Sequence, residues 1–307
     1  MMYRVIGTAG WLGALLAAAG CGSVKNAALD APPADAPVDG VKTCDPLAAF
    51  GAPAPVRGLA IPGLTEGFPQ LSPDELTIYF DGTKSGEQPH LYTAHRASRT
   101  DPFSTPAIMT KLSSDGGNGN ASPSADGLTL WLAYRATTSD QYHLYVATRA
   151  SVLAEFGAPE LAQVVNTTEV ATDAQPFLTQ DGQELWFISG RTPSTDRDYW
   201  RARRSGASFA PPEHVPELSS AALDYAPVLS ADRLTAYVSS SRTGSKGGLD
   251  VWRSRRARVT DVFPAPARVD ELSTTRNDAA NWLSSDNCRI YGASDGDDGS
   301  QIYMASR

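Results

Sequence analysis

The feature that most constrains this chain is an internal repeat. A Phe-x-x-Pro element recurs five times, and its phenylalanines are separated by 53, 53, 53 and 54 residues. The phenylalanines are Phe50, Phe103, Phe156, Phe209 and Phe263. A Ser/Thr-x-Asp element follows each one and precedes a β-rich run, such as LTIYF at 76–80 or LTLWL at 128–132. A fixed period of this length predicts a repeat architecture.

Each repeat has the composition of four short β-strands joined by tight turns. Ser-Pro-Asp and Ala-Asp-Gly form turns, because aspartate bonds its own backbone and glycine permits positive φ. β-branched and aromatic residues fill the intervals between the turns, and no long helical periodicity follows residue 43. The sequence therefore predicts an all-β fold, a five-bladed β-propeller of four-stranded antiparallel blades.

The order of the elements also predicts how the ring closes. The first Phe-x-x-Pro element precedes the first set of inner strands, and no such element follows the last set, which ends at Arg307. The strand near residues 50–60 should therefore complete the last blade, which removes a free sheet edge. Cys44 lies just before this strand, and Cys288 lies in a turn of the last blade. We expect a disulfide between them in an oxidising compartment, the alternative being two free thiols.

The N-terminus has the pattern of an export signal. Arg4 and the apolar stretch 5–19 predict a signal peptide over residues 1–20, since the stretch is too short for a comfortable membrane span. The end of this segment, AAGC, resembles the lipobox of bacterial lipoproteins, which implies acylation of Cys21. The alternative is a plain secreted protein.

The segment after the signal is rich in Ala, Pro and Asp. We interpret residues 21–43 as the lipidated cysteine and a flexible tether, and residues 44–307 as the propeller. Gly22 stands where lipoproteins of the inner membrane often carry aspartate. The resemblance therefore favours the outer membrane, with the protein facing the periplasm or the cell surface.

Composition narrows the possible partners. The chain has 34 acidic against 26 basic residues, which argues against a nucleic-acid partner and against binding to an anionic membrane surface. The lipid anchor is then the only contact with the membrane that we expect. Three cysteines are too few for a disulfide-dense scaffold or an all-cysteine zinc site. The sequence lacks the Gly-x-Ser-x-Gly, Gly-x-x-x-x-Gly-Lys and His-Glu-x-x-His motifs. We expect a monomer with no cofactor.

The blade pattern resembles the WD-like propeller repeats of the TolB type, over residues 50–307. Segments 68–92 (FPQLSPDELTIYFDGTKSGEQPHLY) and 226–252 (APVLSADRLTAYVSSSRTGSKGGLDVW) carry the likeness. The Ser-x-Arg-x-Gly motif is incomplete, since Ser-Arg-Thr-Gly stands only at 241–244. The family's aspartate before the third-strand aromatic stands only at Asp198 and Asp250. The resemblance implies a binding platform that docks envelope proteins on its face and in its channel.

Each blade also offers an acid or amide three residues before the inner-strand proline, or before Asn281 in the last blade. These residues are Glu66, Asn120, Asp173, Asp224 and Asp278. A second set of loops, expected on the same face, brings Lys84, Arg135, Arg191 and Arg242. One interpretation is that acids and bases pair between adjacent blades. The other is an acidic channel mouth that contacts an envelope protein or a glycan.

Two further functions remain open. Carboxylates around a five-bladed channel are what a glycoside hydrolase or lyase requires. We nevertheless expect no catalysis, because a position shared by all repeats is typical of a structural role and the resemblance is to a non-enzymatic propeller. Asp295, Asp297 and Asp298 form a glycine-rich acidic loop that could hold calcium for glycan binding, although the distal bidentate glutamate of an EF-hand is missing.

Overall fold

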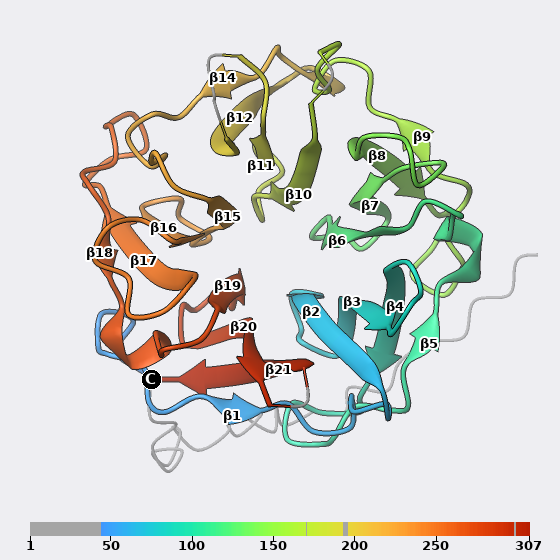
Figure 1. Ribbon diagram of the computed structural model, residues 1–307, viewed down its shortest axis with the longest axis horizontal. Coiled ribbons are helices and arrows are strands. Elements are labelled where there is room, and N and C mark those ends of the chain that lie inside the picture. The colour runs from blue at the N-terminus through green and yellow to red at the C-terminus, as the bar shows by residue number, and fades with distance from the viewer. Residues whose placement is uncertain (1–43, 170, 193–195, 298) are drawn as a thin grey trace, which may run out of the picture. The chain divides into compact units, whose positions relative to one another are not determined.

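Five antiparallel sheets form a ring around a central axis (Figure 1). The computed structural model describes residues 44–307 except 170, 193–195 and 298. The signal peptide, Cys21 and the tether expected from the sequence lie outside the described residues. Within the described part of the chain, no helix has the length and apolar character of a membrane span. The prediction of a five-bladed all-β propeller is confirmed.

Each blade is a sheet whose first strand lies innermost. Blade 1 contains β2 (Leu64–Leu71), β3 (Thr77–Lys84), β4 (His90–His95) and β5 (Ala107–Ile108). Blade 2 contains β6 (Asn118–Pro123), β7 (Thr129–Tyr134), β8 (His143–Thr148) and β9 (Glu160–Leu161). Blade 3 contains β10 (Asp173–Leu178), β11 (Glu184–Ser189), β12 (Asp198–Ser205), β13 (Ser208–Phe209) and β14 (Glu213–His214). Blade 4 contains β15 (Asp224–Leu229), β16 (Thr235–Ser240), β17 (Asp250–Arg255) and β18 (Ala267–Arg268).

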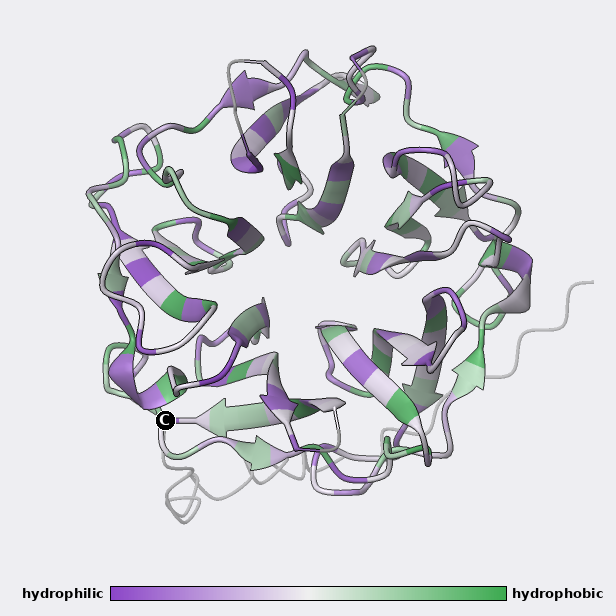
Figure 2. Cartoon of the chain, viewed as in Figure 1, coloured by the Kyte–Doolittle hydropathy of each residue, from purple (hydrophilic) through white to green (hydrophobic). Residues whose placement is uncertain are grey.

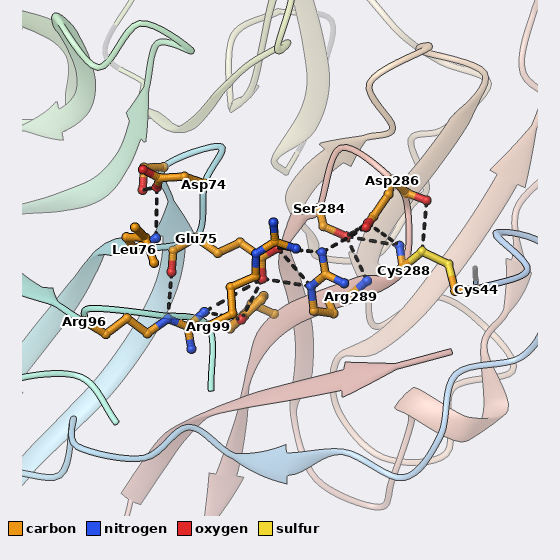
Figure 3. A network of polar contacts seen from close by, with 12 residues as sticks. Cys44, Asp74, Glu75, Leu76, Arg96, Arg99, Ser284, Asp286, Cys288 and Arg289 are labelled. Atoms are coloured by element: carbon orange, nitrogen blue, oxygen red, sulfur yellow. Dashed lines mark hydrogen bonds and ion pairs between the residues drawn. A yellow bond between two sulfur atoms is a disulfide. The ribbon is translucent and has the colours of Figure 1, made fainter. Parts of the chain in front are cut away.

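Blade 5 joins the two ends of the folded chain. It contains β19 (Asp278–Leu283), β20 (Arg289–Gly296) and β21 (Gly299–Ser306), and its outer strand is β1 (Ala54–Pro55). Ala54 pairs with Met304 and Pro55 with Tyr303. A Cys44–Cys288 disulfide, with Cα atoms 6.0 Å apart, holds this closure (Figure 3). Both the closing strand and the disulfide agree with the sequence-based expectation.

The Ser/Thr-x-Asp element forms the turn between the first and second strand of every blade. In blade 1, Leu76 N–H donates to Asp74 Oδ1 and Thr77 N–H donates to Ser72 Oγ, both at 2.9 Å. The residue after the aspartate has a positive φ, which explains Gly127 and Gly182 at this position in blades 2 and 3. Short 3-10 turns (Thr110–Leu112 and Asp270–Leu272) precede the inner strands of blades 2 and 5.

The Phe-x-x-Pro phenylalanines fill the seams between blades. Trp131 of blade 2 packs on Phe209 of blade 3, with ring centroids 5.5 Å apart, and Trp186 packs on Phe263 in the next seam. An arginine at the end of each third strand lies over the phenylalanine of its own blade, 4.1–4.5 Å from the ring centroid: Arg96, Arg149, Arg204, Arg256 and, for Phe50, Arg307. Hydrophobic and hydrophilic residues form bands along strands such as β2 and β17 (Figure 2). The strands β10, β11 and β19 are buried at every position, so both faces of these sheets are packed.

Candidate binding site at the channel mouth

The acids expected to ring the channel mouth are buried inside the blades. Asp173 and Asp224 are 0% exposed, and Asp278 is 2% exposed. Each carboxylate accepts a hydrogen bond from the loop before its strand, at 2.6–2.7 Å, from Thr167, Ser220 or Thr274 N–H. These acids therefore anchor the starts of the inner strands and do not form an exposed ring. Glu66 is also buried, and burial raises its pKa.

Two of the arginines expected at the mouth pair with the acid of their own blade, although pairs between adjacent blades were one of the two expectations. Arg191 contacts Asp173 at 2.5 Å in blade 3, and Arg242 contacts Asp224 at 3.0 Å in blade 4. Arg135 has no acid partner among the described residues; it donates to Gln88 Oε1 at 2.8 Å and lies over Tyr142. Lys84 is exposed at the end of β3.

The strand register corrects the assignment of Asn120. Asn118 pairs with Tyr134 as Asp173 pairs with Ser189, so Asn118 is the residue equivalent to the buried acids. Pro123 of blade 2 stands where Leu178 stands in blade 3, and counting back from that proline shifted the alignment by two residues. Asn120 instead lies in the bulge that interrupts the register of β6.

Bulges in the inner strands close the central channel. Phe68, Asn120, Gln175 and Ala226 have φ between 43° and 56°, and all four line the space between the five inner strands. That space has a volume of about 10 Å³, which is at most one water molecule. Side chains therefore fill the opening that the ribbon leaves at the centre (Figure 1).

A pocket lies at one mouth of this closed channel, on the side of blades 4 and 5. We call it the mouth pocket; its volume is about 320 Å³, and its lining includes Phe68, Tyr225, Asn277, Asn281, Asp295 and Ser300. The rings of Phe68 and Tyr225, from blades 1 and 4, lie 4.9 Å apart between centroids. Phe68 and Asn281 line both the pocket and the channel space, so the pocket is blind.

Asp81 is a carboxyl group close to this mouth and outside the repeat pattern. It pairs with Gly67, and the equivalent positions of the other blades hold Ala133, Ile188, Ser239 and Ala293. Its oxygens accept hydrogen bonds from the backbone N–H and Nδ2 of Asn120, both at 2.6 Å. Within the described ranges, no lysine, arginine or histidine forms an ion pair with it.

Burial raises the pKa of Asp81 to about 8, against the two hydrogen bonds from Asn120, which lower it. Burial also raises the pKa of the Tyr225 hydroxyl, helped by the negative charges of Asp81 and Asp295 and opposed by Arg197. The charges of Asp81 and Asp295 therefore both raise the pKa of the Tyr225 hydroxyl, which lines the pocket.

Stability should depend on pH through Asp81. The folded protein retains this proton up to about pH 8, whereas an unfolded chain releases it near pH 4, so stability falls as the pH rises between these values. Asp81→Asn, which cannot ionise, should therefore become more stable relative to wild type by about 4 kcal/mol as the pH rises from 5 to 9. Urea denaturation of both proteins across this range measures the difference; a gap that stays constant with pH would contradict the assignment.

The acidic loop of blade 5 is partly neutralised. Arg276 donates to Asp297 Oδ1 at 2.7 Å, and Asn277 Nδ2 donates to Asp295 Oδ2 at 2.7 Å. Asp298 lies outside the described residues. Among the residues that the structure describes, no group of three or more His, Cys, Asp or Glu is placed to hold a metal ion.

A cavity larger than the mouth pocket lies elsewhere, in the seam between blades 2 and 3. Its volume is about 670 Å³, and Trp131, Leu178 and Phe209 form its apolar floor. The connection from Arg204 to Phe209 spans five residues, against seven from Arg149 to Phe156 in blade 2. Among the described residues that line this cavity, none has a buried polar side-chain atom without a partner.

Comparisons with known proteins identify the fold and no sequence relative. No family model and no curated protein matches the chain. The catalytic domain of a GH62 α-L-arabinofuranosidase from Coprinopsis cinerea aligns with a TM-score of 0.55 and 12% identity, over 84% of this chain and 96% of that one. A family 117 glycoside hydrolase from the marine bacterium Zobellia galactanivorans aligns with a TM-score of 0.53 and 12% identity, over 84% and 90%.

TolB from Acinetobacter baumannii is also similar, with a TM-score of 0.46 and 15% identity over 78% of this chain. The chain spans about half of that protein, since the alignment covers 53% of its length.

The glycoside hydrolases overturn the prediction that the chain has no catalysis of its own. That prediction relied on the resemblance to a non-enzymatic propeller and on acids that every repeat shares. Proteins named as glycoside hydrolases have the same fold. Asp81, moreover, is a carboxyl group that the repeats do not share.

Phe68 and Tyr225 of the mouth pocket, and Asp81 outside its lining, were missed because each departs from the repeat, whereas Asp295 was named from the sequence as part of the acidic loop. Only the replacement of proline by Asn281 is visible in the sequence by itself. Asp81, Phe68 and Tyr225 become recognisable as departures once the strand register is known.

Proposed function

We propose that this protein is a carbohydrate-binding propeller of the cell envelope whose mouth pocket holds the sugar. The observation that carries the proposal is that aromatic rings and polar groups with unused hydrogen-bonding capacity line the same pocket. Phe68 and Tyr225 supply the rings, and Asp295 and Asn281 supply oxygens. A largely apolar pocket with few, fixed polar groups suits a sugar ring, which has apolar C–H faces and a polar rim. The glycoside hydrolases of the same fold add support.

Hydrolysis of the bound glycan is the second candidate, and Asp81 favours it. Glycoside hydrolysis needs one carboxylic acid that keeps its proton near neutral pH and one ionised carboxylate. A pKa of about 8 gives Asp81 the first property, and Asp295 lies in the same electrostatic neighbourhood. Asp81 would then donate the proton to the leaving oxygen, and Asp81→Asn should abolish any activity.

A glycan array followed by titration of the best ligand tests the proposal. Phe68→Asn removes the ring and keeps the positive φ, which asparagine tolerates and Asn120 adopts in blade 2. We expect this variant to bind about tenfold more weakly or worse. Leu153→Ser, at a 96% exposed residue of blade 2, is the control and should bind as wild type does. Failure to bind any glycan, or equal binding by Phe68→Asn, would refute the proposal.

We also propose that the protein is anchored by lipid in the outer membrane of the cell envelope. The lipobox-like sequence ending at Cys21 supports this, and so does the Cys44–Cys288 disulfide, which favours an oxidising compartment. Cys21→Ser should stop incorporation of labelled palmitate and release the protein from the membrane fraction. Palmitate labelling that survives this substitution would contradict the assignment.

A further inference from the structure

We infer that the sugar bound in the mouth pocket carries a free ammonium group, so that the ligand is an amino sugar. This inference rests on the proposed function and names the class of sugar. Three features of the pocket support it: a buried acceptor without a donor, a carboxylate in the same lining, and two aromatic rings.

The buried acceptor is the side chain of Asn281. The residue is 1% exposed and lines the pocket, and its Oδ1 has no hydrogen-bond partner among the described residues. A buried carbonyl left without a donor costs about 1–3 kcal/mol. The other blades place Pro69, Ala121, Pro176 and Pro227 at this position, so the fold itself needs no polar group there. A ligand that donates a hydrogen bond to Oδ1 would remove the cost.

Asp295 adds a second acceptor and a negative charge. Its Oδ2 accepts from Asn277 Nδ2 at 2.7 Å. Asn277 is in turn held through its Oδ1, which accepts from Leu249 N–H at 2.8 Å, so this amide is committed to the protein. Asn281 Oδ1 and the Asp295 carboxylate are both acceptors, so a ligand that bonds to these oxygens must supply donors.

The charges around the pocket favour a cation. No lysine or arginine belongs to the pocket lining in the part of the chain that the structure describes. Arg276 is held by Asp297 and by the carbonyl of Asp295, the latter at 3.0 Å. Arg197 acts on the Tyr225 hydroxyl, but the charge of Asp295 acts on it in the opposite sense.

An ammonium group fits this arrangement better than a hydroxyl or an acetamide does. It has three donors and no acceptor, so it can donate to the Asp295 carboxylate or to Asn281 Oδ1 without presenting either oxygen with another acceptor. The faces of Phe68 and Tyr225 attract a cation further. A volume of about 320 Å³ lies within the range of small-molecule pockets, so a sugar ring that carries the ammonium group can enter.

Three trisaccharides that differ only at the 2-position test the inference. They are the β-1,4-linked trimers of glucose, N-acetylglucosamine and glucosamine, titrated calorimetrically at mildly acidic pH, where the amine is protonated. We expect the glucosamine trimer to bind about tenfold more tightly than the other two. A lysine tripeptide is the fourth ligand, because it offers ammonium groups without a sugar.

Asn281→Pro restores the residue of three other blades at a position inside the bulge, where no strand pairing is lost. It should reduce the preference for glucosamine to about twofold or less. If the proline variant does not fold, Asn281→Ala is used in its place; alanine is the residue that blade 2 has at this position, Ala121. Equal binding of the three trimers, or an unchanged preference in the Asn281 variants, would overturn the inference and leave glycan binding standing. Tighter binding of the lysine tripeptide would overturn the assignment to a sugar, and binding of no trimer would overturn both proposals.

Discussion

Glu75→Gln should lower the free energy of unfolding by about 3 kcal/mol, because Glu75 is the buried counter-charge of Arg96 and one of the two carboxylates that pair with Arg289. Glu75 lies in the first turn of blade 1, and its side chain is 2% exposed. Arg289 of blade 5 donates to both of its carboxylate oxygens at 2.7–2.9 Å, and Tyr291 donates at 3.1 Å. Figure 3 shows this network at the seam between the last blade and the first. The contact with Glu75 also raises the pKa of Arg289.

Glu155→Gln is the matched control. Glu155 pairs with Lys111 at 2.7 Å, but its side chain is 78% exposed, so the same substitution should cost less than about 1 kcal/mol. The double variant Glu75→Gln, Arg289→Gln should be less destabilised than the sum of its single variants, since neither charge is left alone. Urea denaturation of wild type, the two single variants, the double variant and Glu155→Gln measures these values. A loss below 1 kcal/mol for Glu75→Gln would show that this pair does not hold the seam.

Replacing Cys44 and Cys288 with serine should cost up to about 5 kcal/mol, the chain-entropy value for a loop of this size. The bond joins residues 244 positions apart and confines nearly the whole propeller. Without it, β1 is held to β21 by a two-residue ladder and by Gly51 and Val56, whose N–H groups donate to Ser306 and Ile302.

Hydrogen exchange locates the effect of this double substitution. The amides of Gly51 and Val56 should lose protection more than those of the inner strand β10, because the outer strand of blade 5 loses its covalent tie. Reduction of the wild-type protein should reproduce both the stability loss and the exchange pattern. Identical denaturation curves with and without reductant would contradict this account.

The sequence predicts the fold well because every repeat carries the same turn-forming and seam-filling residues at the same positions. The Ser/Thr-x-Asp turns and the seam phenylalanines occupy fixed positions, and the order of elements leaves one way to close the ring. The arginines over the phenylalanines were also predictable in principle. Arg96, Arg149 and Arg256 each stand seven residues before a phenylalanine, and the last residue, Arg307, completes the set by contacting Phe50.

The candidate site was less accessible to sequence reasoning, for a physical reason. A polar residue that recurs at one position of every blade serves the structure of the blade itself. Asp173, Asp224 and Asp278 accordingly accept hydrogen bonds from the loops before their own strands. The mouth pocket is built from residues that break the repeat. Phe68 and Tyr225 meet from blades 1 and 4, and their contact depends on bulges whose register no spacing reveals.

The most direct test of the central claim is a crystal structure of the protein soaked with the oligosaccharide that binds it best. We predict a sugar ring in the mouth pocket, in contact with Phe68 and Tyr225 and bonded to Asn281 Oδ1 and Asp295. A sugar found only in the seam between blades 2 and 3, beside Trp131 and Phe209, would contradict the assignment of the site.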